Sequence, residues 1–182
     1  MQGIIHYHAM KQIVILCLMA MTAVGVNAQK MMRSMSPRTM SRFFNAKDIQ
    51  PDAVEKLSQL YEQSHWTVLS KDSDPSDGTM ELVVAKNMRM GFGCLEEDGS
   101  DHRGLWLKLE RDGGMRLKHI LVVFADANEQ QLFASELLSM GFTTADDEVF
   151  TRSFSFADGT TVVATASLLW QDGLDVAEID ME

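Results

Sequence analysis

The stretch LWLKLERDGGMRLKHILVVF (residues 105–124) decides the fold class, because it holds two strand-like runs joined by a tight turn. In the first run, LWLKLE, the leucines share one face of a strand, and Trp106, Lys108 and Glu110 share the opposite face. An Asp-Gly pair between two alternating runs is a strong signal for a β-hairpin. The stretch therefore predicts an antiparallel hairpin whose leucine face enters the core. Trp106 is then either exposed or covered by a helix.

Further strand-like runs lie on both sides of this hairpin, each bounded by polar residues or glycine. An acidic loop, DSDPSDG (72–78), separates the two runs that precede it. The final run, LDVAEID, follows another Asp-Gly turn, and we expect it to be a last edge strand. The additional strands are expected at residues 65–71, 79–86, 149–156, 161–170 and 174–180.

Two segments show the spacing of apolar side chains that is typical of amphipathic helices. The first is residues 51–64, which begins with Pro51, a residue well suited to the first helical turn. The second is residues 128–140, which Asn128 is expected to cap, with Gln131 three residues later. We therefore expect an α+β fold, an antiparallel sheet with two helices on one face. Its other face would be partly open to solvent or to a partner.

A faint internal repeat accompanies the order helix, strands, helix, strands. LSQLYEQSHWT resembles ASELLSMGFT, and DGTMELVVA resembles DGTTVVATA. A tandem duplication would explain these similarities, and so would the common requirements of any helix-plus-hairpin unit. We expect residues 48–182 to form a single domain, within which 48–125 and 126–182 are the two candidate units.

Residues 1–28 have the features of a cleavable signal peptide. Lys11 provides a positive charge, an apolar run follows at 13–26, and the VNA at 26–28 has the small-x-small pattern of a cleavage site. An uncleaved anchor is the alternative, but the apolar run is shorter than the roughly 20 residues of a membrane span. The sequence also lacks Asn-x-Ser/Thr triplets. We therefore expect a bacterial protein that is exported, periplasmic or extracellular, with no stable membrane span after leader cleavage.

Residues 29–47 form a basic, methionine-rich segment in an otherwise acidic chain. Serines and Pro37 interrupt this segment and no helical period persists, so we expect a linker. The whole chain has a net charge of −10, and loss of Lys11 with the leader would make it −11. Because such a surface repels phosphate backbones, nucleic acid is not an expected partner.

Cys94 would be the single cysteine of the mature chain, because cleavage of the leader removes Cys17. No internal disulfide is therefore expected. Cys94 lies next to glycine, and Asp101 and His102 follow within eight residues. A thiol with a histidine and a carboxylate is a known arrangement for nucleophilic catalysis. A buried core cysteine is the simpler interpretation, because no expected helix follows Cys94 to lower its pKa.

Two groups of residues raise the question of metal binding. Met32 and Met35 have a suitable spacing for thioether ligands of Cu(I), but arginines lie among them, and a solvated segment with incidental methionines is simpler. Asp72, Asp74 and Asp77 offer oxygen ligands for calcium, although their order departs from that of an EF-hand. Carboxylates are also common in exposed turns for backbone reasons. We therefore expect no cofactor.

Trp106 and Trp66 are the candidate ligand-binding residues, because exposed aromatic side chains on a sheet can form a binding surface. Ordinary packing between sheet and helix is the alternative. Since no catalytic pattern is strong, the leading hypothesis is an exported, non-enzymatic binding or interaction domain. Its partner would be an exported or surface protein or a small ligand. The alternatives are a hydrolase-like enzyme that uses Cys94 and a periplasmic protein that binds copper or calcium.

Overall fold

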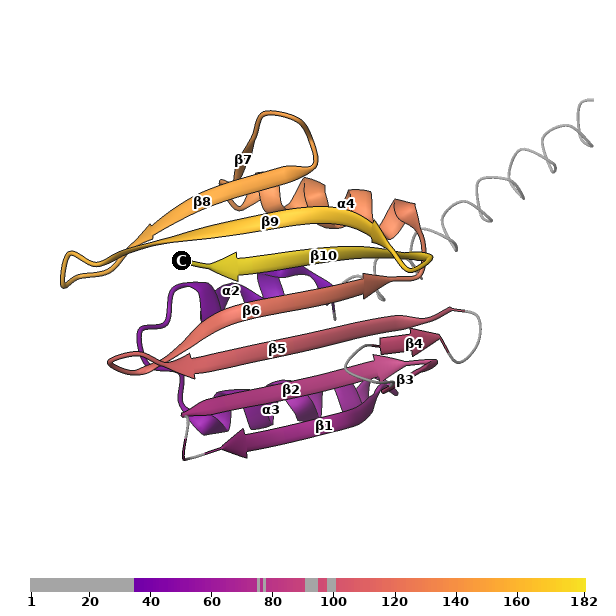
Figure 1. The fold of residues 1–182 in the computed structure, drawn as a ribbon, viewed down its shortest axis with the longest axis horizontal. Helices are drawn as coiled ribbons and strands as arrows, with labels where there is room; N and C mark the ends of the chain where they lie inside the picture. Colours follow the sequence, from indigo (N-terminus) through magenta and orange to yellow (C-terminus); the bar gives the residue numbers. More distant parts are fainter. Residues whose placement is uncertain (1–34, 75, 77, 91–94, 98–100) are drawn as a thin grey trace, which may run out of the picture. The chain divides into compact units, whose positions relative to one another are not determined.

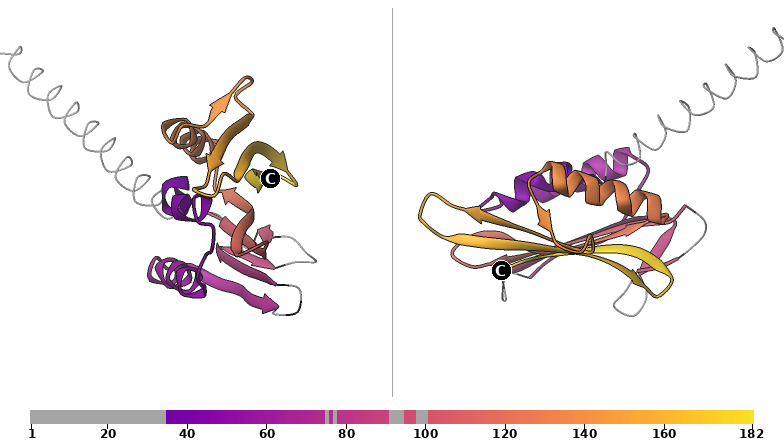
Figure 2. Two further views of the ribbon diagram at one scale, coloured as in Figure 1. Left: turned by 90° about the vertical axis from the view of Figure 1, so that its left-hand side faces the viewer. Right: turned by 90° about the horizontal axis from the view of Figure 1, so that it is seen from above.

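The computed structural model describes residues 35–74, 76, 78–90, 95–97 and 101–182. In these ranges, three helices lie against one face of a large antiparallel sheet (Figures 1 and 2). The expected α+β class with an antiparallel sheet is therefore confirmed, with one helix more than expected.

The elements have the following bounds. The helices are α2 (Pro37–Phe44), α3 (Pro51–Gln63) and α4 (Ala127–Ser139). The strands of the large sheet are β1 (Thr67–Asp74), β2 (Thr79–Lys86), β5 (Arg103–Arg111), β6 (Met115–Phe124), β7 (Thr143–Thr144), β8 (Val149–Ser155), β9 (Thr161–Gln171) and β10 (Leu174–Met181). A separate small sheet contains β3 (Met88–Met90) and β4 (Leu95–Glu97).

The hairpin expected at residues 105–124 is present as β5 and β6. Its leucines at 105, 107 and 109 are all buried beneath the helices, as their alternation predicts. Gly113 adopts a φ of +64° in the turn, a conformation that glycine adopts without steric cost. A Cβ atom on Gly114 would lie 2.6 Å from the carbonyl oxygen of Lys47, so glycine also lets the chain before α3 pack against the turn.

The strand order of the large sheet is β1-β2-β5-β6-β10-β9-β8-β7, which corrects one expectation from the sequence. β10 is not an edge strand, because it pairs with β6 on one side and with β9 on the other. Residues on both of its faces are buried, including Val176, Ala177 and Ile179. This burial on both faces explains the interior position, since an edge strand with one open side needs fewer apolar residues.

The order of strands is symmetric about the β6–β10 pair. On one side α3 precedes β1, β2, β5 and β6, and on the other side α4 precedes β7, β8, β9 and β10. Two tandem helix-plus-strand units would produce this order. In such a duplication the connection from β1 to β2 would correspond to the connection from β7 to β8. The two DGT turns are therefore not equivalent, because the first connects β1 to β2 and the second connects β8 to β9.

Helix α2 occupies much of the segment that was expected to be a linker. Ser36 caps it by accepting a hydrogen bond from the Arg38 amide at 3.2 Å, and Pro37 opens its first turn. The Ser36 hydroxyl also donates to Glu136 of α4, and Arg38 donates to Ser139 at 2.7 Å. The helix buries its apolar side in the core through Met40, Phe43 and Phe44. Two turns of helix contain too few apolar residues to show a period among the surrounding polar ones.

Helix α4 begins one residue earlier than the sequence indicates, and its cap is a different residue. Asp126, not Asn128, is the N-cap, and its carboxylate accepts a hydrogen bond from the Glu129 amide at 3.0 Å. The carboxylate of Glu129 accepts in turn a hydrogen bond from the Ala125 amide at 3.3 Å. The arrangement resembles a capping box in which both side chains, Asp126 and Glu129, are acidic.

Candidate functional site

The described helices leave one face of the large sheet uncovered (Figure 2). A second apolar cluster lies on that face. Gly104 makes this cluster possible, because a Cβ atom there would lie 2.6 Å from Cδ1 of Leu95 and 3.2 Å from the sulfur of Met88. The small β3–β4 sheet therefore packs closely against β5 at this point. The buried members of the cluster are Val83, Ala85, Met88, Leu95, Val123, Leu174 and Val176.

A groove with a volume of about 350 Å³ lies beside this cluster. Trp106, Leu121, Val123 and Val176 come from four adjacent positions on three neighbouring strands and line its apolar part. Leu95, together with the β9–β10 turn, lines the groove at the end where the small sheet packs. Its size is that of a site for a small organic ligand or for a few side chains of a partner.

Trp106 is half-buried on this face, so neither alternative from the sequence describes it fully. The indole Nε1–H is shielded from solvent and has no hydrogen-bond acceptor within the described part of the chain. A buried donor without a partner costs about 1–3 kcal/mol. The Trp106 side chain therefore brings a hydrogen-bond donor without an acceptor into an otherwise apolar wall.

A row of polar side chains crosses the sheet beside the apolar wall, and Glu81, Lys108 and His119 of this row line the groove. The strand register places Glu81, Lys108, His119 and Asp180 side by side on β2, β5, β6 and β10. His119 Nδ1 lies 2.9 Å from a carboxylate oxygen of Asp180, and Lys108 Nζ lies 3.2 Å from Glu110. Both bases of the row are therefore already paired with carboxylates.

Three other carboxylates of the groove have no such partner. Within the described ranges, no hydrogen bond or ion pair to the side chains of Glu81, Asp172 or Glu178 is observed. A groove that combines an apolar wall with unpaired carboxylates favours a ligand with an apolar body and a positive charge.

The other tryptophans lie elsewhere. Trp66 was a candidate ligand-binding residue, but its side chain is only 7% exposed and packs against Tyr61 with ring centroids 4.9 Å apart. It belongs to the helix-covered core and presents no surface to a ligand. Trp170, at the end of β9, is 76% exposed and does not line the groove.

The candidate catalytic residues are only partly described. Cys94 lies outside the described residues, so its distance to His102 is not defined. Asp101 binds Lys86 at 2.5 Å through one carboxylate oxygen and the guanidinium of Arg103 through the other. Burial alone would raise the pKa of Asp101, but hydrogen bonds and charges from Lys86 and Arg103 outweigh it and lower this pKa. Asp101 therefore takes part in an ion-pair network that continues through Arg103 to Glu129.

The candidate metal ligands do not converge where they are described. Met35 is buried in the core, and Met32 lies outside the described residues. Asp72 and Asp74 accept hydrogen bonds from the amides of Ser73 and Ser76, each at 2.8 Å, and Asp77 is not described. In the described ranges, no group of three or more histidine, cysteine or acidic side chains is placed to hold a metal ion.

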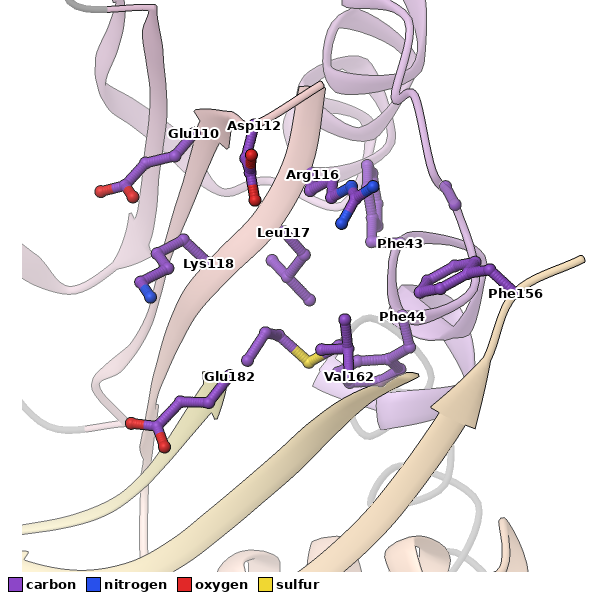
Figure 3. A pocket seen from close by; sticks show the side chains of 12 residues that line it. Phe43, Phe44, Glu110, Asp112, Arg116, Leu117, Lys118, Phe156, Val162 and Glu182 are labelled. Atoms are coloured by element: carbon purple, nitrogen blue, oxygen red, sulfur yellow. The ribbon is translucent and has the colours of Figure 1, made fainter. Parts of the chain in front are cut away.

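A second hollow, of about 190 Å³, opens between the β5–β6 turn, the C-terminal end of α2 and the start of β9 (Figure 3). Arg116 lies in it with its guanidinium 5.7 Å from the ring centroid of Phe156. Of the residues that line the two hollows, the sequence singled out Trp106 and missed the others. Each hollow combines residues from strands that are far apart in the chain. The alternation of MRLK at 115–118 identifies a strand but gives no indication of its neighbours.

None of the helices in the described ranges is both long enough and apolar enough to cross a membrane. Comparison with known proteins adds no assignment: no family model, no curated protein and no solved structure matches this chain.

Proposed function

We propose that this chain is an exported, non-enzymatic binding module whose ligand occupies the groove at Trp106. The groove itself is the observation that carries the proposal, since it combines an apolar wall with an indole donor and carboxylates that have no partner among the described residues. The leader-like residues 1–28 support export. Within the described part of the chain, which contains neither cysteine, no serine or threonine side chain hydrogen-bonds to His119.

The ligand expected from this chemistry has three parts. An apolar body would lie on Trp106 and Leu121, where burial of apolar area contributes about 25 cal/mol per Å². A hydrogen-bond acceptor would satisfy the Trp106 indole after a small shift of the atoms that now cover it. A positive charge would lie near Glu178, the strand partner of Leu121, where it would also be attracted by the indole ring of Trp106.

Nuclear magnetic resonance of the three indole N–H groups tests the proposal within one protein. Hexylamine, hexanol and hexanoate have the same apolar chain and differ in charge, so they serve as probes. We expect hexylamine to shift the Trp106 signal most and hexanoate least. Trp66 is buried on the other side of the sheet and Trp170 lies outside the groove, so their signals should stay in place. Tryptophan-to-phenylalanine variants assign the three signals.

A charge reversal gives the matched control. Glu178→Lys should weaken hexylamine binding several-fold. Glu62→Lys, at an exposed position of α3, makes the same change in net charge away from the groove and should not weaken it. Equal shifts of the Trp106 and Trp170 signals, or an equal effect of the two charge reversals, would contradict the groove as the site.

A further inference from the structure

The hollow around Arg116 has its origin in the unequal lengths of three strands. β10 pairs with β6 only from His119 onward and with β9 only from Ala164 onward. The first residues of β6 and β9 therefore lie on either side of a gap, which a pair of backbone hydrogen bonds between Val163 and Glu182 narrows. Phe43 and Phe44 of α2 line this gap from the helix side. The result is a crevice in the sheet that is closed behind by aromatic side chains.

Arg116 is the residue in this crevice that points to a ligand. Its Nε atom is shielded from solvent, and the described residues provide no hydrogen-bond acceptor for it. No carboxylate of the described residues forms an ion pair with its guanidinium, which instead lies over the ring of Phe156. A partly buried guanidinium without a counter-ion is unusual, because burial of a charge is costly unless the charge is paired.

The acidic residues of the crevice do not fill this role. Glu110 is the strand partner of Arg116, but its carboxylate forms an ion pair with Lys108 at 3.2 Å. Figure 3 shows the carboxylates of Glu110 and Glu182 turned away from the guanidinium, which lies on the same side as Phe43 and Phe156. Asp112 also lines the crevice, and no ion pair between its carboxylate and Arg116 is observed among the described residues. The guanidinium therefore faces the crevice with the ring of Phe156 as its observed contact.

We propose that this crevice binds a small carboxylic acid whose body is aromatic or a short aliphatic chain. The carboxylate would pair with Arg116, whose planar guanidinium matches a carboxylate with two parallel hydrogen bonds. The apolar body would lie among Phe43, Phe44, Phe156 and Val162. The volume of about 190 Å³ limits the ligand to a small molecule, and the site is separate from the groove at Trp106.

Titration of the purified chain with benzoate, benzamide, benzylamine and inorganic phosphate tests this proposal by calorimetry and thermal unfolding. Benzoate should bind and raise the melting temperature, whereas benzamide and benzylamine lack the anion and phosphate lacks the apolar body. The Arg116 side-chain Nε–H resonance should shift with benzoate, and the Trp106 indole resonance should not. This second readout reports on the site in the unmodified protein.

Arg116→Gln should weaken benzoate binding at least tenfold, and Arg116→Lys should weaken it less because a positive charge remains. Arg111→Gln is the matched control, because Arg111 is exposed on the same hairpin and does not line the crevice. Equal binding of benzoate and benzamide, or unchanged binding by Arg116→Gln, would overturn the proposal. So would the absence of any Arg116 resonance shift at a benzoate concentration of about 10 mM, well above that needed for a millimolar site.

Discussion

Phe44→Ala should destabilise the fold strongly, because α2 is part of the core and not a tether. The Phe44 side chain is 1% exposed, and its ring lies 5.8 Å from that of Phe154 and 6.2 Å from that of Phe142. Truncation of a buried phenylalanine to alanine costs about 3–5 kcal/mol, which includes the cavity that remains. Loss of two favourable ring pairs places the expected cost in the upper part of this range.

Urea unfolding followed by tryptophan fluorescence measures this cost, with buried Trp66 as a reporter of the core. A loss of about 4 kcal/mol corresponds to a fall in melting temperature of roughly 8–16 °C for a chain of this size. Leu138→Ala is the control, because Leu138 is 47% exposed on α4 and should change stability by no more than about 0.5 kcal/mol. A Phe44→Ala effect as small as that of Leu138→Ala would refute the packing of α2 and would restore the linker interpretation.

Three further predictions follow from single positions. Gly104→Ala should destabilise the protein by about 1–3 kcal/mol in urea unfolding, because the new methyl group displaces Leu95 from the sheet. A cost near zero would show that the small β3–β4 sheet is loosely attached to β5. The lowered pKa of Asp101 means that its ionised form stabilises the fold above its unfolded pKa of about 4, and that this contribution disappears as the pH falls through the lower folded pKa. The difference in urea midpoint between wild type and Asp101→Asn should therefore be constant near neutral pH and shrink in acid. Asparagine tolerates the φ of +63° at this position, so the substitution should not strain the backbone. A difference that stays constant down to low pH would show that the effect does not come from the charge of Asp101. Trp170→Ser should leave the melting temperature nearly unchanged, since the side chain is 76% exposed, and a large loss would mean that Trp170 is covered in solution.

Local patterns in the sequence identified those elements whose determinants lie within one hairpin or one long helix. The β5–β6 hairpin has both its alternation and its turn within residues 105–124, and both are present in the structure. Helix α3 likewise has its proline start and its apolar face within one segment. Helix α2 escaped prediction although Ser36-Pro37 is a helix-start signal, because its two turns bury only Pro37, Met40, Phe43 and Phe44, too few residues to show a period.

The position of β10 could not be inferred in the same way. Alternation assigns the residues of LDVAEID to faces, but it cannot state which strand lies on each side. The β9–β10 pair is itself a local hairpin. The interior position follows from a non-local fact, namely that β10 also pairs with β6 on the side that the β5–β6 hairpin leaves open. The burial of Val176 on one face and Ile179 on the other is consistent with it in retrospect.

The same non-local step creates both candidate ligand sites. Trp106 could be assigned from sequence to the face opposite the leucines, but Glu178 joins it only because β10 inserts beside β6. The Arg116 crevice exists because the same inserted strand is shorter than its neighbours, so the sheet opens where β10 ends. Lengthening of β10 would therefore be expected to close the crevice and leave the groove intact. The two sites thus depend on opposite ends of one strand, which explains why a chain with ordinary local patterns can carry two hollows of different charge preference.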